Sequence, residues 1–485
     1  MTTRALRQPA VTFPPAAVLT VLGLGLLAVC AAFAAVGLQK ATALLLGMLF
    51  VIPAVLNLPA AVILWVPFAF LPPLGFVGAA PTAGAAVILL AWLPSLRARG
   101  AATRTLLALH RRLILLGLVL LTWITLSVSW ALHPENGIAH LWQWWLAGIA
   151  FLVSVTTIST PRQARLFVAM LVVGALLSAL IGILGQSLST SSDSLALAAA
   201  DRQRFGSLLD DPNYVAAGMV AAIVLATGLL RPRHPVANLL LVASMGVLTV
   251  TVAATESRGA LVAAGIATVA ALLFFSGRRA QVAITIGTLV AVAAIWFSFN
   301  PHAWQRISEF DSSGTGRTAL WTVAWRIAED HPVNGVGLDN FVEQAPKYTL
   351  EPGKLELVHN IAEKPHVAHN VYLQFLAETG FIGAILWILL VLGCARSAWR
   401  AGRLFDLKSD RDMANLARGC LVGIIAFAAA SFFLSDGNDV RFWLLLALGP
   451  IMYGVAVRLP MAERPDRVYH RRASAGAWAV HGRPT

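Results

Sequence analysis

The sequence contains few charged residues. Asp, Glu, Lys and Arg make up 12% of its 485 residues, whereas hydrophobic residues make up 58%. A water-soluble domain carries roughly a quarter charged residues, so the composition excludes a soluble protein and leaves no room for a separate soluble domain of ordinary size. Apolar runs of about 20 residues, the length that spans a bilayer, recur from near the start to near the end. The sequence therefore predicts an all-α polytopic integral membrane protein.

Cysteine and acidic residues are also scarce. Cys30, Cys394 and Cys420 lie in or beside apolar runs, which is typical of small buried hydrophobic residues, and they form neither a disulfide framework nor a metal-binding spacing. No Asp or Glu occurs before Glu135. The first loops therefore lack the carboxylate cluster that a divalent metal needs, and we expect neither a metal nor a cofactor.

The apolar runs predict where the chain crosses the membrane. The run at 16–37 is too long for the apolar region of a cleaved signal peptide, and similar runs follow, so it is interpreted as the first span. Residues 41–95 are apolar but interrupted by prolines, which predicts one to three broken or re-entrant spans. The other clear spans are 113–132, 141–159, 166–187, 212–230, 237–254, 260–275, 282–299, 371–395, 419–434 and 441–457.

The net charge of +13 would suit a nucleic-acid partner, but its distribution argues for membrane topology instead. Basic clusters alternate with loops poor in Lys and Arg, as the positive-inside rule expects. All of them share one side if residues 41–95 cross the membrane an odd number of times, which gives about 12–14 spans with both termini in the cytoplasm. The clusters are Arg4 and Arg7, residues 97–112, Arg162 and Arg165, Arg231 and Arg233, Arg278 and Arg279, residues 396–418, and the tail after Arg458.

This topology divides the chain into four parts. They are an N-terminal group of transmembrane helices at 1–299, an outward-facing loop with amphipathic helices at 300–368, C-terminal transmembrane helices at 369–457, and a basic cytoplasmic tail at 458–485. Three shorter segments also face outward, at 188–211, 255–260 and 435–439. Almost all the unusual polar residues lie on this outward face.

The segment 300–368 is the only long hydrophilic connection, and a connection of this length is usually functional or disordered. Within it, GRTALWTVAWRIAEDHP predicts an ordered amphipathic helix that ends before Pro332. Its apolar stripe consists of Leu320, Val323, Ala324 and Ile327, and its tryptophans favour the membrane interface. NGVGLDN follows. Its glycines would let the backbone approach a phosphate, but a turn is the favoured interpretation.

Three arginines lie on the outward face, against the positive-inside bias. Arg258 begins a helix that enters the membrane, Arg204 precedes the span at 212, and Arg317 opens the tryptophan-rich helix. Each one alone has a simpler explanation as a snorkelling side chain or a member of a salt bridge. Together they favour an anion with several oxygens, because guanidinium groups suit phosphate by bidentate geometry.

The turn SDGND contains two acidic residues, Asp436 and Asp439, that resemble a calcium-binding pair. A solvated turn is the favoured interpretation. If an activated phosphate donor is used on this face, the arginines rather than a metal must neutralise the leaving diphosphate.

The stretch HVAHNVYLQFLAETG runs directly into an apolar span. Pro365 is suitably placed to start a helix, along which Asn370, Gln374 and Glu378 form one polar stripe. Polar groups within the membrane are costly and usually line a cavity. His369, beside the top of the stripe, can accept a proton from a hydroxyl at neutral pH. The alternative for His369 is a helix-capping or packing histidine.

Three segments occur in the order ESRGALVA, GRTALWTVAWRIAEDHPVNGVGLDNF and HNVYLQFLAETGFIG. In that order they resemble the signature segments of the O-antigen ligase and polymerase superfamily of bacterial inner-membrane glycosyltransferases. RFGSLLDDPNYVA is similar to an earlier R-x-G…P-N segment of that family, and RFWLLLALGP matches more weakly. The resemblance covers roughly residues 200 to 395, and the first half of the chain matches only in hydropathy.

The resemblance implies a GT-C-like helical fold with one large periplasmic loop. It also implies metal-independent transfer of a glycan from undecaprenyl diphosphate to an acceptor hydroxyl, which in ligases belongs to lipid A-core and gives mature lipopolysaccharide. The resemblance also assigns roles to matching residues. Arg258 and Arg317 would bind the diphosphate, as would Arg204, whose flanking match is looser. His369 would be the catalytic histidine.

The mechanism expected from the residues agrees with this resemblance. His369 would accept the hydroxyl proton while the arginines stabilise the departing diphosphate, and direct attack predicts inversion at the anomeric carbon. Asn370, Gln374 and Glu378 would line the donor or acceptor cavity, with Glu378 paired to an arginine.

Other functions compete with the ligase. A polymerase and a protein O-oligosaccharyltransferase share the donor lipid and differ in the acceptor; one long loop before the HN segment favours the ligase. A transporter for an anion such as bicarbonate would also need outward arginines. Transporters are often built from repeated halves, whereas the proline-broken spans at 41–95 have no counterpart after residue 400 and the polar chemistry lies on one face.

Overall fold

The computed structural model describes residues 51–71, 79–98, 100–189, 211–308, 317–349, 367–435 and 437–460. The structure is 87% helical, and none of the described residues forms a strand. The predicted all-α class is therefore confirmed. The first predicted span at 16–37 lies outside the described residues, as do Arg204 and Asp436.

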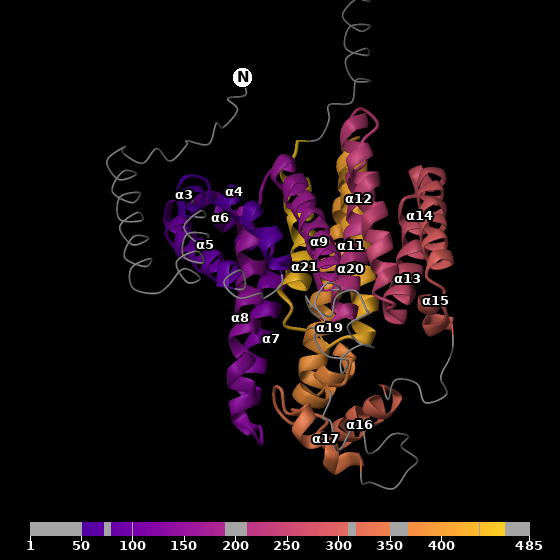
Figure 1. Ribbon diagram of the computed structural model, residues 1–485. Helices are drawn as coiled ribbons and strands as arrows, with labels where there is room; N and C mark the ends of the chain where they lie inside the picture. Colours follow the sequence, from indigo (N-terminus) through magenta and orange to yellow (C-terminus); the bar gives the residue numbers. More distant parts are fainter. Residues whose placement is uncertain are drawn as a thin grey trace, which may run out of the picture.

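From residue 51 onward, the described part of the N-terminal half starts with short helices and continues with long ones (Figure 1). Prolines interrupt the chain as predicted, since Pro67 lies in a 3₁₀ turn and Pro94 lies inside α5. The elements are α3 Val51–Leu56, α4 Leu58–Trp65, η1 Val66–Phe70, α5 Ala79–Ala98, α6 Gly100–Leu109, α7 Arg111–Ser127, η2 Val128–Trp130, α8 Pro134–Thr157, α9 Pro161–Ser189, α11 Pro212–Leu229 and α12 Pro235–Ala254.

Three short helices in the second half separate two groups of longer helices. These short helices, α15 to α17, occupy the predicted outward loop. The elements are α13 Arg258–Phe274, η4 Ser276–Arg278, α14 Arg279–Phe299, α15 Pro301–Ser308, α16 Arg317–Asp330, α17 Phe341–Thr349, α19 Val371–Leu407, α20 Arg411–Ala430, η5 Ser431–Phe433 and α21 Val440–Arg458.

Within the described residues, 9 helices are long and apolar enough to cross a membrane. They are α7 (with η2), α8, α9, α11, α12, α14, α19, α20 (with η5) and α21. Shorter apolar helices lie at Leu58–Phe70, Gly84–Leu96 and Arg258–Phe274. The protein is a multi-pass membrane protein. The short helices at Leu58–Phe70 and Gly84–Leu96 agree with the interruption predicted in residues 41–95, and the number of crossings there stays a prediction.

The centre of the bundle is formed by α11, α19, α20 and α21 (Figure 1). Small residues let these helices approach closely, as is usual between membrane helices. A Cβ added to Gly419 would lie 2.9 Å from the Cα of Gly228. Cys394 and Cys420 are fully buried free thiols in this core, which confirms that they act as small hydrophobic residues. At the edge, α14 buries only Val282 among its side chains.

Several of the predicted basic clusters that fall within the described residues meet at one end of the bundle. The side chain of Arg278 donates to the carbonyl of Leu230 (3.1 Å) and lies 3.6 Å from Asp412. Arg418 of α20 pairs with Asp406 near the end of α19 at 2.5 Å. The basic segments therefore gather on one end, as the topology requires, and their cytoplasmic location stays a prediction.

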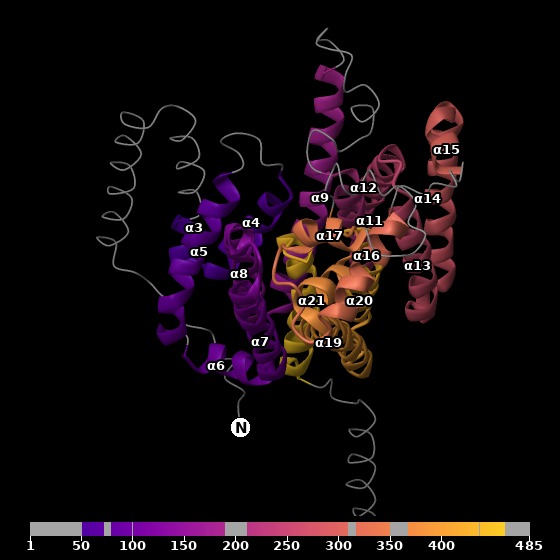
Figure 2. The same cartoon turned by 90° about the horizontal axis from the view of Figure 1, so that it is seen from below.

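The opposite end is covered by α16 and α17, which lie across the beginning of α19 (Figures 1 and 2). The predicted amphipathic helix is confirmed, because the stripe Leu320, Val323, Ala324 and Ile327 is buried and α16 ends two residues before Pro332. This stripe packs in a separate small core with side chains of α17 and α19, including Phe341, Ala345, Tyr348 and Ala377.

Candidate functional site

A break in α19 shapes the site. Gly380 has φ 66° and ψ −174°, so the helix is interrupted after its first turns and then resumes. The broken turn leaves three consecutive carbonyls without helical partners. The amides of Val336 and Gly337 donate to the carbonyls of residues 377 and 378 at 2.9 and 2.8 Å, and the indole of Trp123 donates to the carbonyl of Thr379 at 2.9 Å. These three carbonyls are thus satisfied by groups from other parts of the chain, as buried backbone groups generally are.

Two of the three donors at this break come from the NGVG segment. The predicted turn is confirmed. The amides of Val336 and Gly337 donate to carbonyls of α19, so these amides do not form a phosphate cradle. The turn and the break fit closely: a Cβ on Gly335 would lie 2.3 Å from the carbonyl carbon of Glu378, and one on Gly380 would lie 2.1 Å from the carbonyl oxygen of Val333.

Arg258 is the first residue of α13. The hydroxyl of Ser257 accepts from the amide of Ala260 as the helix cap and donates to Oδ1 of Asn213 at 2.7 Å. The next residue, Gly259, packs on η5, since an added Cβ would lie 2.8 Å from the Cβ of Phe433. These contacts hold Arg258 between the start of α11 and η5.

Arg317 begins α16, and its helix reaches the same segment from the other side. Trp321, one turn after Arg317, contacts Phe433 with ring centroids 6.3 Å apart. The starts of α13 and α16 therefore meet across a single side chain, that of Phe433.

His369 stands immediately before α19 with φ 48°, a left-handed conformation that costs energy in most residues. Asn370 is the cap of α19, and its Oδ1 accepts from the amides of Tyr372 (3.0 Å) and Leu373 (3.1 Å). The ring of Tyr372 packs 4.5 Å from that of Phe432 in η5. His369, Arg258 and Arg317 thus stand at the starts of three helices that converge on η5.

One prediction about this helix is corrected: it begins at Val371 rather than near Pro365, because the Asn370 side chain supplies the cap. Asn370 is not among the described residues that line the cavity below, and its contact with a substrate stays a prediction.

Gln374 and Glu378 line a cavity of about 310 Å³ at the same end of the bundle. Gln374 Nε2 donates to Glu378 Oε1 at 3.0 Å, and Glu378 is buried. Within the described part of the chain, this carboxyl faces Gln374 and the backbone amides of Asp339 and Phe341 instead of an arginine. The lining residues are Ile124, His140, Gln143, Trp144, Leu338, Asp339, Val367, Val371, Gln374, Phe375, Glu378, Thr379, Ser435, Gly437 and Asn438.

Several polar residues of this cavity were not predicted from the sequence. His140 Nδ1 lies 2.9 Å from Asp339 Oδ2, and Asn438 Nδ2 donates to Gln143 Oε1 at 2.5 Å. Burial raises the pKa of Asp339 while the neighbouring His140 opposes that rise. The sequence signal was the polar and aromatic run AHLWQWW at the start of α8, which gathers His, Gln and Trp in two turns.

Asp439 has a structural role. It caps α21 by accepting from the amide of Arg441, and it pairs with the guanidinium of the same arginine at 2.6 Å. Its side chain is 10% exposed, so the predicted solvated turn is wrong at this residue. Among the described residues, no cluster of three or more His, Cys, Asp or Glu side chains is close enough to hold a metal ion.

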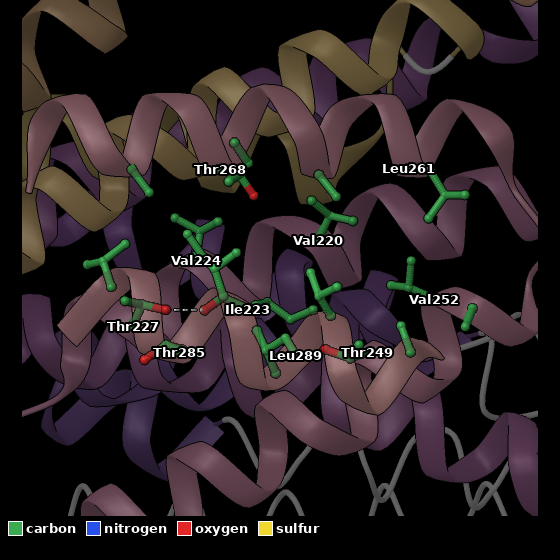
Figure 3. A pocket seen from close by; sticks show the side chains of 18 of the residues that line it. Val220, Ile223, Val224, Thr227, Thr249, Val252, Leu261, Thr268, Thr285 and Leu289 are labelled. Carbon is green, nitrogen blue, oxygen red and sulfur yellow. Dashed lines mark hydrogen bonds between the residues drawn. The ribbon is translucent and has the colours of Figure 1, made fainter. Parts of the chain in front are cut away.

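A second cavity, of about 190 Å³, lies between α11, α12, α13 and α14 (Figure 3). Its walls are aliphatic side chains and threonines such as Thr227, Thr249 and Thr285. The three threonine hydroxyls donate to carbonyls of their own helices at 3.1, 2.8 and 3.0 Å. The cavity therefore offers an apolar lining that suits a hydrocarbon chain.

Residues 243–388 match the model of the O-antigen ligase family. The match runs from α12 to the resumed part of α19 and includes Arg258, Arg317, His369, Gln374 and Glu378. No curated protein matches the chain. The resemblance to the O-antigen ligase superfamily is confirmed, and it supports a glycosyltransferase-like membrane enzyme of the ligase or polymerase type.

Proposed function

Proceeding from the O-antigen ligase match at residues 243–388, we propose that this protein is an O-antigen ligase. It transfers a glycan from undecaprenyl diphosphate to a sugar hydroxyl of lipid A-core on the periplasmic face of the bacterial inner membrane. The observation that carries this proposal is the convergence of the helix starts bearing Arg258, Arg317 and His369 on η5.

The arginines bind the donor diphosphate. Guanidinium groups make bidentate, charge-assisted hydrogen bonds to phosphate oxygens. Because both arginines sit at helix starts, the positive ends of two helix dipoles add to their charge. Arg258 and Arg317 thereby stabilise the negative charge that develops on the leaving diphosphate, without a metal ion.

His369 acts as the general base. Its imidazole accepts the proton of the acceptor hydroxyl as that oxygen attacks the anomeric carbon. The bond between the anomeric carbon and the diphosphate oxygen breaks, and the electron pair leaves with the diphosphate. Direct attack opposite the leaving group inverts the configuration at the anomeric carbon.

The apolar cavity in Figure 3 receives part of the polyprenyl chain of the donor. The helix α13 begins with Arg258 and lines that cavity from Leu261 to Ala271. A polyprenyl chain in the cavity therefore has its diphosphate end directed toward Arg258.

The basic end of the bundle faces the cytoplasm in this proposal, so the His369 end faces the periplasm and both termini are cytoplasmic. The helices α16 and α17 supply a periplasmic layer across the beginning of α19. A single such layer favours the ligase over a polymerase or a protein O-oligosaccharyltransferase.

The test is glycan transfer in vitro with EDTA present. Purified protein receives undecaprenyl-diphosphate-linked oligosaccharide and lipid A-core, and the parent is compared with His369→Ala and with Gln281→Leu, an exposed amide on α14 that serves as the control. Transfer to the core that survives EDTA, persists in the control and collapses in His369→Ala supports the ligase.

Other products would overturn this proposal in defined ways. Longer glycans on the undecaprenyl carrier identify a polymerase, and glycan on an added acceptor protein identifies a protein O-oligosaccharyltransferase. No glycan product from folded protein, together with bicarbonate or sugar-acid uptake into proteoliposomes, identifies a transporter.

A further inference from the structure

The cavity beside the first turns of α19 contains buried polar atoms that no protein group satisfies. Gln374 Oε1 and Ser435 Oγ are both buried and have no hydrogen-bond partner in the described part of the chain, and both residues line the cavity. Buried polar atoms are nearly always hydrogen-bonded, by protein, water or ligand. These two atoms therefore indicate a ligand or solvent that brings hydrogen-bond donors into the cavity.

The described lining residues disfavour an anion. Asp339 and Glu378 contribute two carboxyl groups, and none of the described residues that line the cavity is Lys or Arg. His140 is the one basic side chain among them, and Asp339 already pairs with it at 2.9 Å. A diphosphate would be repelled here, whereas hydroxyl groups would find carboxyl and amide acceptors.

The cavity also has a fixed aromatic wall. Trp144 lines it and is held edge-on against Phe375 and Trp387, with ring centroids 5.3 and 6.3 Å apart. An indole offers a flat apolar surface together with a polar edge. The volume of about 310 Å³ is at the lower end of the range of roughly 300–1,000 Å³ that holds small organic ligands.

The cavity lies on a different face of α19 from the arginine side. Tyr372 packs on Phe432 of η5, whereas Gln374 lines the cavity. Two residues along an α-helix are separated by about 200° around its axis. The first turns of α19 thus divide an anion-binding side from a side rich in neutral hydrogen-bonding groups.

We propose that this cavity is the binding site of one uncharged pyranose ring, held by Gln143, Gln374, Ser435 and Asn438 with Trp144 against its apolar face. The assignment of that ring to the acceptor or to the donor glycan rests on the proposed function. The presence of the pyranose site itself does not, because it follows from the cavity alone.

The first experiment measures binding without catalysis. Saturation-transfer-difference NMR is recorded on the full-length protein in detergent micelles with glucose, galactose, rhamnose and N-acetylglucosamine. At least one pyranose gives a signal that falls several-fold in Gln374→Leu and in Ser435→Ala, persists in Gln281→Leu, and is unchanged by excess inorganic diphosphate. Thermal unfolding of each variant verifies its fold, and Ser435→Ala removes a single hydroxyl if Gln374→Leu does not fold.

Two results overturn the site. One is the absence of signal from all four pyranoses with the folded parent. The other is a signal that both cavity variants leave intact or that inorganic diphosphate displaces, since either behaviour puts the sugar outside this cavity.

The second experiment identifies the source of the ring through transfer kinetics of Gln143→Leu. Loss of roughly one net hydrogen bond should raise KM by about tenfold. The rise appears in the KM for the acceptor alone if the ring belongs to the acceptor. It appears in the KM for the donor alone if the ring belongs to the donor. If Gln143→Leu is active and its KM values for donor and acceptor are both unchanged, the inference of a pyranose site is overturned, whereas the proposed ligase function is not affected. Absence of transfer in the parent overturns the ligase, while the NMR result still decides the pyranose site.

Discussion

The backbone amide of Gly337 donates a 2.8 Å hydrogen bond to the carbonyl of Glu378. This bond joins the turn after α16 to the break in α19, two segments that are 41 residues apart (378 − 337). On one side of the break stand His369 and the cavity, and on the other the helix continues through the membrane. The site geometry thus depends on a helix that stops and restarts where an external turn supplies its missing hydrogen bonds.

We expect Gly380→Ala to disrupt this junction. A Cβ at Gly380 would lie 2.1 Å from the Val333 carbonyl oxygen, and φ is 66°. The left-handed backbone alone costs roughly 1–3 kcal/mol for a residue with a side chain, and the clash adds to that cost. The thermal unfolding midpoint should fall and glycan transfer should be lost.

Gly246→Ala is the matched control, because a Cβ at Gly246 in α12 meets nothing within 4 Å and Ala is a better helix former than Gly by about 1 kcal/mol. Its unfolding midpoint should be equal to or above that of the parent. A Gly380→Ala protein as stable and active as the parent would show that the break does not support the site.

We expect His369→Asn to separate chemistry from backbone strain. Asn tolerates the left-handed region better than Ala does, and His369 has φ 48°. Loss of a general base lowers the rate by roughly 10²–10⁴-fold, so His369→Asn should be inactive with an unfolding midpoint near that of the parent. His369→Ala should be equally inactive and less stable. Retained turnover in folded His369→Asn would contradict the role of general base.

We expect Arg258→Lys to be nearly as damaging as Arg258→Ala. Lys keeps the positive charge but cannot form a bidentate pair with a phosphate. If Arg258 stabilises the leaving diphosphate, each substitution should lower kcat by about 10²–10³-fold, as the loss of one charge-stabilising donor does in other enzymes. Transfer rates at saturating donor measure this effect. Full activity in Arg258→Lys would mean that charge alone suffices.

The parts of the fold that depend on residues close together in the sequence were predictable. The stripe of α16 repeats with helical spacing, and the turn at NGVG is encoded by its own glycines. The break at Gly380 was not predicted, because ETGFIG is compatible with a continuous apolar helix. The interruption is stabilised by groups far away in the sequence: the amides of Val336 and Gly337 and the indole of Trp123 donate to its carbonyls, and the carbonyl of Pro332 accepts from the amide of Phe381.

The candidate site was predictable to a similar degree. Gln374 and Glu378 share a helix face, so their common cavity followed from their spacing. Gln143 and Asn438 meet across 295 residues of chain, and nothing in the spacing of either segment indicates that contact. The role of Asp439 as a helix cap was not predictable either. It depends on α21 beginning at Val440, and the Asp439 side chain itself fixes that start.

His110 should make the fold sensitive to acid at the basic end of the bundle. Burial, together with the charge of Arg458, lowers the pKa of His110 from 6.5 to about 4. Between these values the unfolded chain binds a proton that the folded protein does not, so stability falls as the pH is lowered from 6.5 to 4. The full shift corresponds to about 3 kcal/mol. The unfolding midpoint in detergent should therefore fall over this range, and His110→Leu should reduce the slope of the midpoint against pH.

The exposed His302 provides the control, since His302→Leu should leave that slope unchanged. A slope that is equal in the parent and in His110→Leu would place the acid sensitivity in other groups.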